Sequence, residues 1–191
     1  APVFDESVEK RVLEEIVYPA IRGMAADGTP YQGVLYVGLM IDAEGNPRVI
    51  EFNVRFGDPE TQPLMVRMQA DLVPLLDGAA RGCLDEGKPM TWGDAAVCVV
   101  LASGGYPRAY ETGLAIAGLE AAERDANVVV FHAGTKRSGT GYVSAGGRVL
   151  GVTARGDDVA EARERAYAAV DQITFEGMHQ RRDIALRGLK G

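Results

Sequence analysis

The chain of 191 residues carries a net charge of −7, with 47% hydrophobic and 25% charged residues, which is ordinary for a globular protein of one large domain or two small ones. The negative charge argues against nucleic acid as a main partner, because phosphate backbones are bound by clustered lysines and arginines. We expect no membrane span, since no stretch approaches roughly 18 consecutive apolar residues, and we expect no signal peptide at the start of the chain.

The first part of the chain predicts a helix followed by a β-hairpin. Apolar residues recur at helical spacing over residues 6–26, Asp5 is a suitable N-terminal cap, and Pro19 is expected to bend the helix. Strands are predicted over residues 33–41 and 48–54. The short glycine-containing turn between them favours an antiparallel hairpin.

The rest of the chain predicts another helix and then a region rich in strands. The helix is predicted over residues 63–81, with a kink at Pro74. The polar segment 85–94 contains glycine and proline and indicates a domain junction. A helix capped by Asp158 is predicted over residues 158–173. Short strands come before it, at residues 95–102, 128–133, 141–144 and 148–154. The predicted fold class is α+β.

One predicted strand and the turn after it carry most of the chemistry. Glu51 and Asn53 lie two residues apart on the strand, so their side chains point the same way. Carboxylate and amide oxygens are hard ligands, which suit Mg²⁺ held between protein and nucleotide phosphates. Arg55 adds a guanidinium for an anion, and the turn brings the carboxylates of Asp58 and Glu60 to the strand end. This pattern predicts a metal and substrate site.

The sequence resembles one enzyme family along essentially its whole length. The run Arg-Phe-Gly-Asp-Pro-Glu-Thr-Gln at residues 55–62 is the most specific motif. Further motifs occur in the family's order, at residues 36–41, 104–107, 131–136, 146–150 and 182–184. This combination is similar to the phosphoribosylamine–glycine ligases, also called glycinamide ribonucleotide synthetases, of the ATP-grasp superfamily.

The resemblance implies the C-terminal portion of an ATP-grasp domain over residues 1–88, followed by the family's small β-rich C-terminal domain, with its terminal helix, over residues 95–191. It implies ATP-dependent ligation of glycine to 5-phospho-β-D-ribosylamine in purine biosynthesis, through a glycyl phosphate intermediate, with ADP and phosphate as products. The family's amino-terminal half, with most of the ATP clamp, is missing from this sequence. We therefore expect a piece of a longer protein, or a chain that works with a second one, and no turnover by the chain alone.

The resemblance also implies roles for the strand residues. Glu51 and Asn53 match the positions at which the family binds Mg²⁺ or Mn²⁺. Gly38 is expected across the hairpin, so ATP phosphates and water would complete the metal site. Arg55 would stabilise charge on the transferred phosphoryl group or the acyl phosphate. The alternatives are a solvated strand face and a surface ion pair between Arg55 and Glu60.

Other positions are assigned to the ribosylamine substrate. By analogy with related purine ligases, Asp58 would contact the amine, although an aspartate before proline also favours a purely structural turn. Lys136 and Arg148 follow glycine-rich turns and are predicted to clamp the ribose 5-phosphate, unless both are exposed solubility charges. Ala185 departs from the family, in which glycine is usual at this position.

Two other functions remain open. One is a different ATP-grasp enzyme, such as a biotin-dependent or aminoimidazole ribonucleotide carboxylase, against which the intact motif at residues 55–60 argues. The other is a non-catalytic fragment that binds only a partner chain or a phosphorylated ligand. Cys83 and Cys98 lack metal-ligand spacing and a disulfide pattern, so a reducing, cytoplasmic location is predicted.

Overall fold

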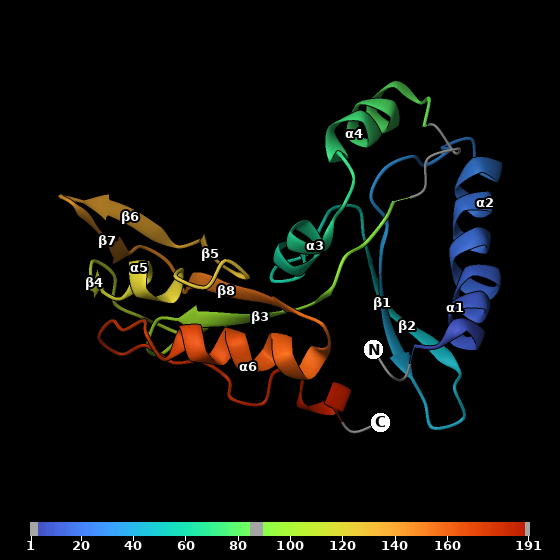
Figure 1. Cartoon of the computed structure of the whole chain (residues 1–191). Coiled ribbons are helices and arrows are strands. Elements are labelled where there is room, and N and C mark those ends of the chain that lie inside the picture. Colours follow the sequence, from blue (N-terminus) through green and yellow to red (C-terminus); the bar gives the residue numbers. More distant parts are fainter. Residues whose placement is uncertain (1–3, 85–89, 190–191) are drawn as a thin grey trace. The chain divides into compact units, whose positions relative to one another are not determined.

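The computed structural model describes residues 4–84 and 90–189. The chain forms two compact units (Figure 1). The first contains the residues up to Gly57 together with Gln69–Thr91, and the second contains Asp58–Met68 and Trp92–Leu189. The predicted junction at residues 85–94 lies partly outside the described residues, and the domain boundary placed there stays a prediction.

The first unit begins with a continuous helical segment, as predicted for residues 6–26. The carboxylate of Asp5 accepts a hydrogen bond of 2.8 Å from the N–H of Val8, so the predicted cap is confirmed. A π-helical turn lies directly before Pro19, whose ring nitrogen cannot donate to the carbonyl of Glu15. The successive parts are α1 (Glu6–Val12), the π-helical turn η1 (Leu13–Val17) and α2 (Tyr18–Ala26).

The predicted hairpin is confirmed, with β1 (Tyr36–Ile41) antiparallel to β2 (Pro47–Asn53). The register puts Gly38 opposite Glu51, as expected from the sequence, and a β-bulge follows between Gly38 and Leu39. The bulge shifts the pairing by one residue, so that Leu39 pairs with Val49 and Ile50 has no partner in the register.

A hydrogen-bonded turn closes the hairpin and connects it to the helix. The carboxylate of Asp42 accepts from the backbone N–H groups of Glu44, at 3.1 Å, and Asn46, at 2.8 Å. The side-chain amide of Asn46 also donates to it, and these bonds lower the pKa of the Asp42 carboxyl. Arg11 of α1 donates to the carbonyl of Gly45 at 3.1 Å, which joins helix and turn.

The prediction of one helix over residues 63–81 is wrong, because the structure has α3 (Thr61–Arg67) and α4 (Leu72–Arg81). Met68 takes an extended backbone with ψ of 126° and pairs with Trp92, a contact that no local pattern indicates. Asp71 then caps α4 by accepting from the N–H of Val73 at 2.9 Å. Pro74 falls in the first turn of α4, where a helix needs no N–H donor, so it starts a helix rather than kinking one.

The second unit is built on an antiparallel sheet in the order β3-β8-β5. All three strands coincide closely with predicted ones. Helix α6 covers one face of this sheet, and α3 contacts β3 and β8 (Figure 1). Asp158 caps α6 by accepting from the N–H of Glu161 at 2.8 Å, as the sequence predicts. These elements are β3 (Ala95–Ala102), β5 (Val128–His132), β8 (Arg148–Gly156) and α6 (Val159–Val170).

A smaller sheet in the order β4-β7-β6 completes the second unit. The prediction included β7 but missed β4, β6 and α5. Strand β6 is polar and exposed, so its sequence lacks the apolar alternation that marks a strand. The further elements are β4 (Ala115–Ile116), α5 (Leu119–Ala122), β6 (Thr135–Ser138), β7 (Gly141–Ser144) and a 3₁₀ turn η2 (Leu186–Leu189). Within the described ranges, every helix is too short or too polar to cross a bilayer.

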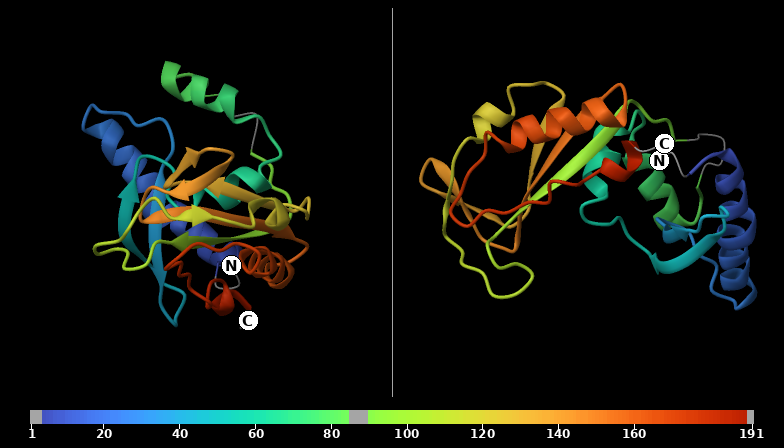
Figure 2. Two further views of the ribbon diagram at one scale, coloured as in Figure 1. Left: turned by 90° about the vertical axis from the view of Figure 1, so that its left-hand side faces the viewer. Right: turned by 90° about the horizontal axis from the view of Figure 1, so that it is seen from below.

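Strand β3 separates the core of the second unit from a pocket. Val97, Val99 and Leu101 are buried in the core cluster beneath α6. The alternate residues of β3 face the other way, as strand geometry requires. After α6 the chain runs along β3 (Figure 2, right), where His179 and Ala102 exchange backbone hydrogen bonds of 2.9 and 3.0 Å. This pairing brings the C-terminal segment to the rim of the pocket.

Candidate functional site

The predicted metal ligands lie on one face of β2 in the first unit. Glu51 is exposed and Asn53 is half-buried. The register puts Gly38 opposite Glu51 and Tyr36 opposite Asn53. A Cβ atom at Gly38 would lie 3.1 Å from Cγ of Glu51, so glycine leaves room for the methylene stem of that side chain. A carboxylate and an amide oxygen side by side fit Mg²⁺ or Mn²⁺. Among the described residues no cluster of three or more His, Cys, Asp or Glu side chains is found, so other groups would have to complete the coordination.

The opposite face of β2 is apolar, but it is open to solvent. Ile50 and Phe52 on this face are 64% and 45% exposed, and Val54, directly after the strand, is 68% exposed. Phe52 and Val54 line an apolar hollow of about 300 Å³ together with Ile21 and Met24 of α2. The two faces of the strand therefore differ in chemistry.

Arg55 and Asp58 fall in different units, although only two residues separate them in the sequence. Arg55 is exposed, and its Nη1 donates to the carbonyl of Phe56 at 3.2 Å. The predicted joint action of Arg55 and Asp58 on one substrate therefore stays a prediction.

Asp58 and Arg148 meet in the second unit, although they lie 90 residues apart in the sequence. Nη1 of Arg148 donates to the backbone carbonyl of Asp58 at 2.8 Å and to its carboxylate at 3.1 Å. Gln62, from the first turn of α3, donates to the other carboxylate oxygen at 3.2 Å. The hydrogen bond to Asp58 raises the pKa of the Arg148 guanidinium. Two residues predicted independently to contact the ribosylamine substrate are therefore neighbours.

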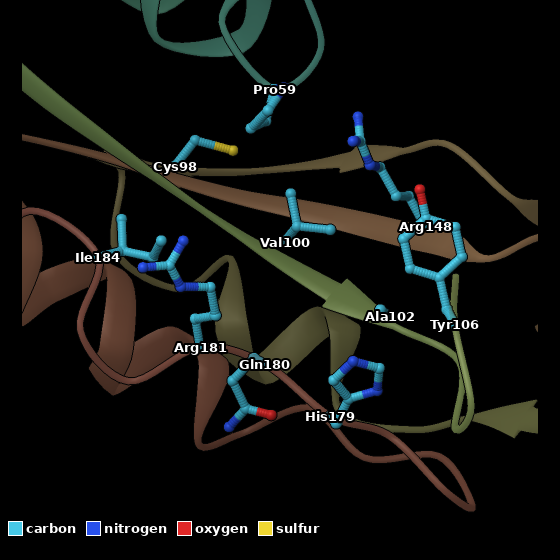
Figure 3. A pocket seen from close by; sticks show the side chains of 10 residues that line it. All are labelled: Pro59, Cys98, Val100, Ala102, Tyr106, Arg148, His179, Gln180, Arg181 and Ile184. Carbon is cyan, nitrogen blue, oxygen red and sulfur yellow. The ribbon is translucent and has the colours of Figure 1, made fainter. Parts of the chain in front are cut away.

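A pocket of about 280 Å³ opens beside this ion pair (Figure 3). Its floor is the apolar face of β3, and its rim is formed by polar side chains from distant segments. Arg148 stands next to Tyr106 on one side of the floor, and Arg181 lies on the other side (Figure 3). The lining residues are Pro59, Cys98, Val100, Ala102, Tyr106, Arg148, His179, Gln180, Arg181 and Ile184. An apolar floor with charged groups at the rim suits a small polar ligand.

Lys136 lines a different pocket from Arg148. It lies in β6, opposite Val143, and lines a separate pocket of about 400 Å³. The backbones do approach, because the N–H of Gly134 donates to the carbonyl of Arg148 at 2.8 Å. Arg148 lines the 280 Å³ pocket and Lys136 the 400 Å³ one, so a joint role of the two cations stays a prediction.

The sequence alone indicated no role for three residues that line this pocket, which are Cys98, Tyr106 and Arg181. Tyr106 and Arg181 stand within or beside recognisable motifs, which was the available signal. Cys98 is buried, and burial raises the pKa of its thiol. Ala185 has a φ of 64°, a left-handed conformation that favours glycine, which accounts for the residue usual there.

Family models and curated relatives identify the same family. Residues 1–61 match the family described as phosphoribosylglycinamide synthetase, ATP-grasp (A) domain, and residues 96–187 match its C domain. The chain is 49% identical over 189 residues to the phosphoribosylamine–glycine ligase of Vibrio vulnificus strain YJ016 and 52% identical over 192 residues to that of Salmonella typhimurium. In each case the matched region covers nearly all of this chain but only 44% of the relative.

Solved structures agree on the fold. The crystal structure of phosphoribosylamine–glycine ligase from Thermotoga maritima has a TM-score of 0.81 and 35% identity, over 96% of this chain and 44% of that one. N5-carboxyaminoimidazole ribonucleotide synthetase from the same organism has a TM-score of 0.61 at 18% identity, over 90% of this chain and 43% of that one, and shares the ATP-grasp fold alone. The chain thus belongs to the phosphoribosylglycinamide synthetase family, and it spans less than half the length of the relatives it matches.

Proposed function

We propose that this chain is the C-terminal part of a phosphoribosylamine–glycine ligase. The enzyme would join glycine to 5-phospho-β-D-ribosylamine in de novo purine biosynthesis and split ATP into ADP and phosphate. The observation that carries the proposal is the Asp58–Arg148 pair, at 3.1 Å, on the rim of a 280 Å³ pocket. A carboxylate beside a guanidinium complements a substrate that carries both an amine and a phosphate.

The reaction has two steps. The γ-phosphoryl group of ATP passes to the carboxylate of glycine, which gives glycyl phosphate and ADP. The amine of the ribosylamine then attacks the carbonyl carbon, a C–N bond forms, the C–O bond to phosphate breaks and the amine loses a proton. Each step concentrates negative charge on phosphoryl oxygens, and cationic groups aimed at that charge lower the barrier.

Different residues of the chain would bind the metal, the phosphoryl group and the ribosylamine. Glu51 and Asn53 would hold Mg²⁺ or Mn²⁺, which neutralises phosphate charge when bound. Arg55 would stabilise the phosphoryl group in transfer. Asp58 would accept hydrogen bonds from the ribosylamine amine, while Arg148, with Lys136 as a second cation, would bind its 5-phosphate.

The proposed enzyme needs residues beyond those of this chain. The relatives' preceding part would supply most of the ATP site, so the chain alone is expected to show no turnover. We also propose that the protein is cytoplasmic, because Cys83 and Cys98 are free thiols, which a reducing compartment preserves.

The test is a fusion of this chain to the preceding part of the Vibrio cholerae relative, which is 51% identical over the matched region. We expect ADP release that requires glycine, phosphoribosylamine and a divalent metal, with none from the chain alone. The fusion with Asp58→Asn should lose most of the phosphoribosylamine-dependent rate. A folded fusion without ligation, next to an active Vibrio cholerae control, would refute the proposal.

A further inference from the structure

A second arginine stands on the pocket that contains Arg148. Arg181 lines the same 280 Å³ cavity, on the side formed by the C-terminal segment (Figure 3). The apolar floor made by Cys98, Val100 and Ala102 lies between the two guanidinium groups. The pocket therefore presents positive charge from two walls, although the proposed function uses only one of them.

The backbone around Arg181 is held in place by Tyr167, a buried residue of α6 with 8% exposure. Its hydroxyl donates to the carbonyl of Arg181 at 2.7 Å and accepts from the N–H of Ile184 at 3.2 Å. Arg163 lies 4.6 Å from the centre of the Tyr167 ring and donates to the carbonyl of Ile184 at 2.9 Å. On the other side, His179 is paired with β3. A segment fixed at both ends presents the side chain between them.

The charge on each arginine is balanced but still accessible. Arg181 binds Asp183 through two hydrogen bonds of 2.9 and 2.7 Å, while Arg148 binds Asp58. The side chains of Arg181 and Asp183 are 73% and 58% exposed, so their ion pair is screened by water and weak. A guanidinium carries more N–H donors than one carboxylate uses. A phosphate dianion can therefore bind without a large cost in broken contacts.

We propose that Arg181 is a second anion-binding residue of the Arg148 pocket, positioned by Tyr167, and that the two arginines together bind a phosphate monoester. The choice of a sugar phosphate as ligand rests on the proposed function, while the recognition of a phosphate group rests on the pocket alone. A purely structural Arg181–Asp183 ion pair would have no effect on ligand binding.

The experiment measures binding of ribose 5-phosphate to the chain by titration calorimetry, with ribose and inorganic phosphate in parallel. Arg181→Gln is expected to weaken ribose 5-phosphate binding about tenfold, the loss of one charge-assisted contact. Arg148→Gln should weaken it at least as much. Arg124→Gln removes the same charge from an exposed position outside this pocket and should leave affinity unchanged. Ribose should bind to none of these proteins.

The pH profile separates recognition from structure. A phosphate monoester gains its second charge at a pKa of about 6. His179 also lines the pocket and becomes a cation at low pH, so the profile is measured in a His179→Asn background, where affinity should fall as the pH decreases through that value. The fall should be smaller in Arg181→Gln, which lacks one of the two cations. Arg181→Lys should restore part of the pH dependence. Tyr167→Phe should weaken binding without removing a charge, and its thermal unfolding shows whether the fold is kept.

The outcomes are decisive for the proposal. Equal weakening of inorganic phosphate and ribose 5-phosphate by Arg181→Gln supports it, because both share the phosphate group. An Arg181→Gln protein that binds ribose 5-phosphate as the unsubstituted chain does, while Arg148→Gln loses binding, overturns it. So does absence of saturable binding to the unsubstituted chain at millimolar ligand. Ligation by the fused enzyme is a separate readout, so failure of the proposed function leaves this result readable.

Discussion

Removing either partner of the Asp58–Arg148 pair should cost unequal amounts of stability. Arg148 donates both to the carboxylate and to the backbone carbonyl of Asp58, so Asp58→Asn removes the charge from the first contact and leaves the second intact. The side chains are 41% and 53% exposed, and an ion pair of this kind contributes about 0.2–1 kcal/mol. The hydrogen bond to the backbone adds about 1 kcal/mol.

A double-mutant cycle measures this difference. We expect a loss of unfolding free energy of about 0.5 kcal/mol for Asp58→Asn and about 1.5 kcal/mol for Arg148→Gln. The double variant should resemble Arg148→Gln, with a coupling energy of about 0.5 kcal/mol. Urea unfolding with linear extrapolation gives these values, and repetition in 1 M salt should remove most of the coupling, since the Debye length falls to about 3 Å.

Two results would refute this reasoning. One is a larger cost for Asp58→Asn than for Arg148→Gln, which would mean that the backbone contact is unimportant. The other is a coupling energy well above 1 kcal/mol that survives high salt, since this would require a pair shielded from solvent.

Four further predictions concern single positions. In the fused enzyme, Glu51→Gln should abolish metal-dependent ADP release while circular dichroism stays unchanged; full activity would contradict the metal assignment. A Cβ at residue 147 would overlap Cδ2 of Tyr106, so Gly147→Ala should displace that ring, as a crystal structure of the variant would reveal, and should weaken ribose 5-phosphate binding in titration calorimetry. The pKa of Asp42 is lowered by its hydrogen bonds, so its contribution to stability should persist above the ordinary value of about 3.9 and be lost as the pH falls through the lower folded value; NMR titration with a midpoint at or above about 3.9 would disprove this. Ala185→Gly should raise the unfolding free energy by about 1 kcal/mol, because glycine adopts a φ of 64° without strain, and an unchanged urea midpoint would argue otherwise.

Local chemistry was readable from the sequence wherever neighbours along the chain make the decisive contacts. The cap at Asp5 and the cap at Asp158 involve residues three positions away, and both were predicted correctly. The same holds for the hairpin, whose turn residues bond to one another, and for the shared face of Glu51 and Asn53, which follows from strand geometry alone.

Prediction failed where a distant segment overrides a local preference. Residues 63–81 have helical periodicity throughout, yet Met68 leaves the helix to pair with Trp92, and Asp71 starts a new one. Strand β6 was missed for the converse reason. Its residues are polar, and only pairing with β7 makes them a strand.

The sequence by itself determined the family, the main elements and the candidate ligands Glu51 and Asn53. Only the tertiary structure decided which distant residues share a pocket. Asp58 meets Arg148 across 90 residues because α3 packs on strand β8, which begins with Arg148, and Arg181 reaches the same pocket because its segment pairs with β3 at Ala102. Contacts of this kind depend on packing between distant segments. The spacing of apolar residues within one segment predicts its secondary structure but not its partner.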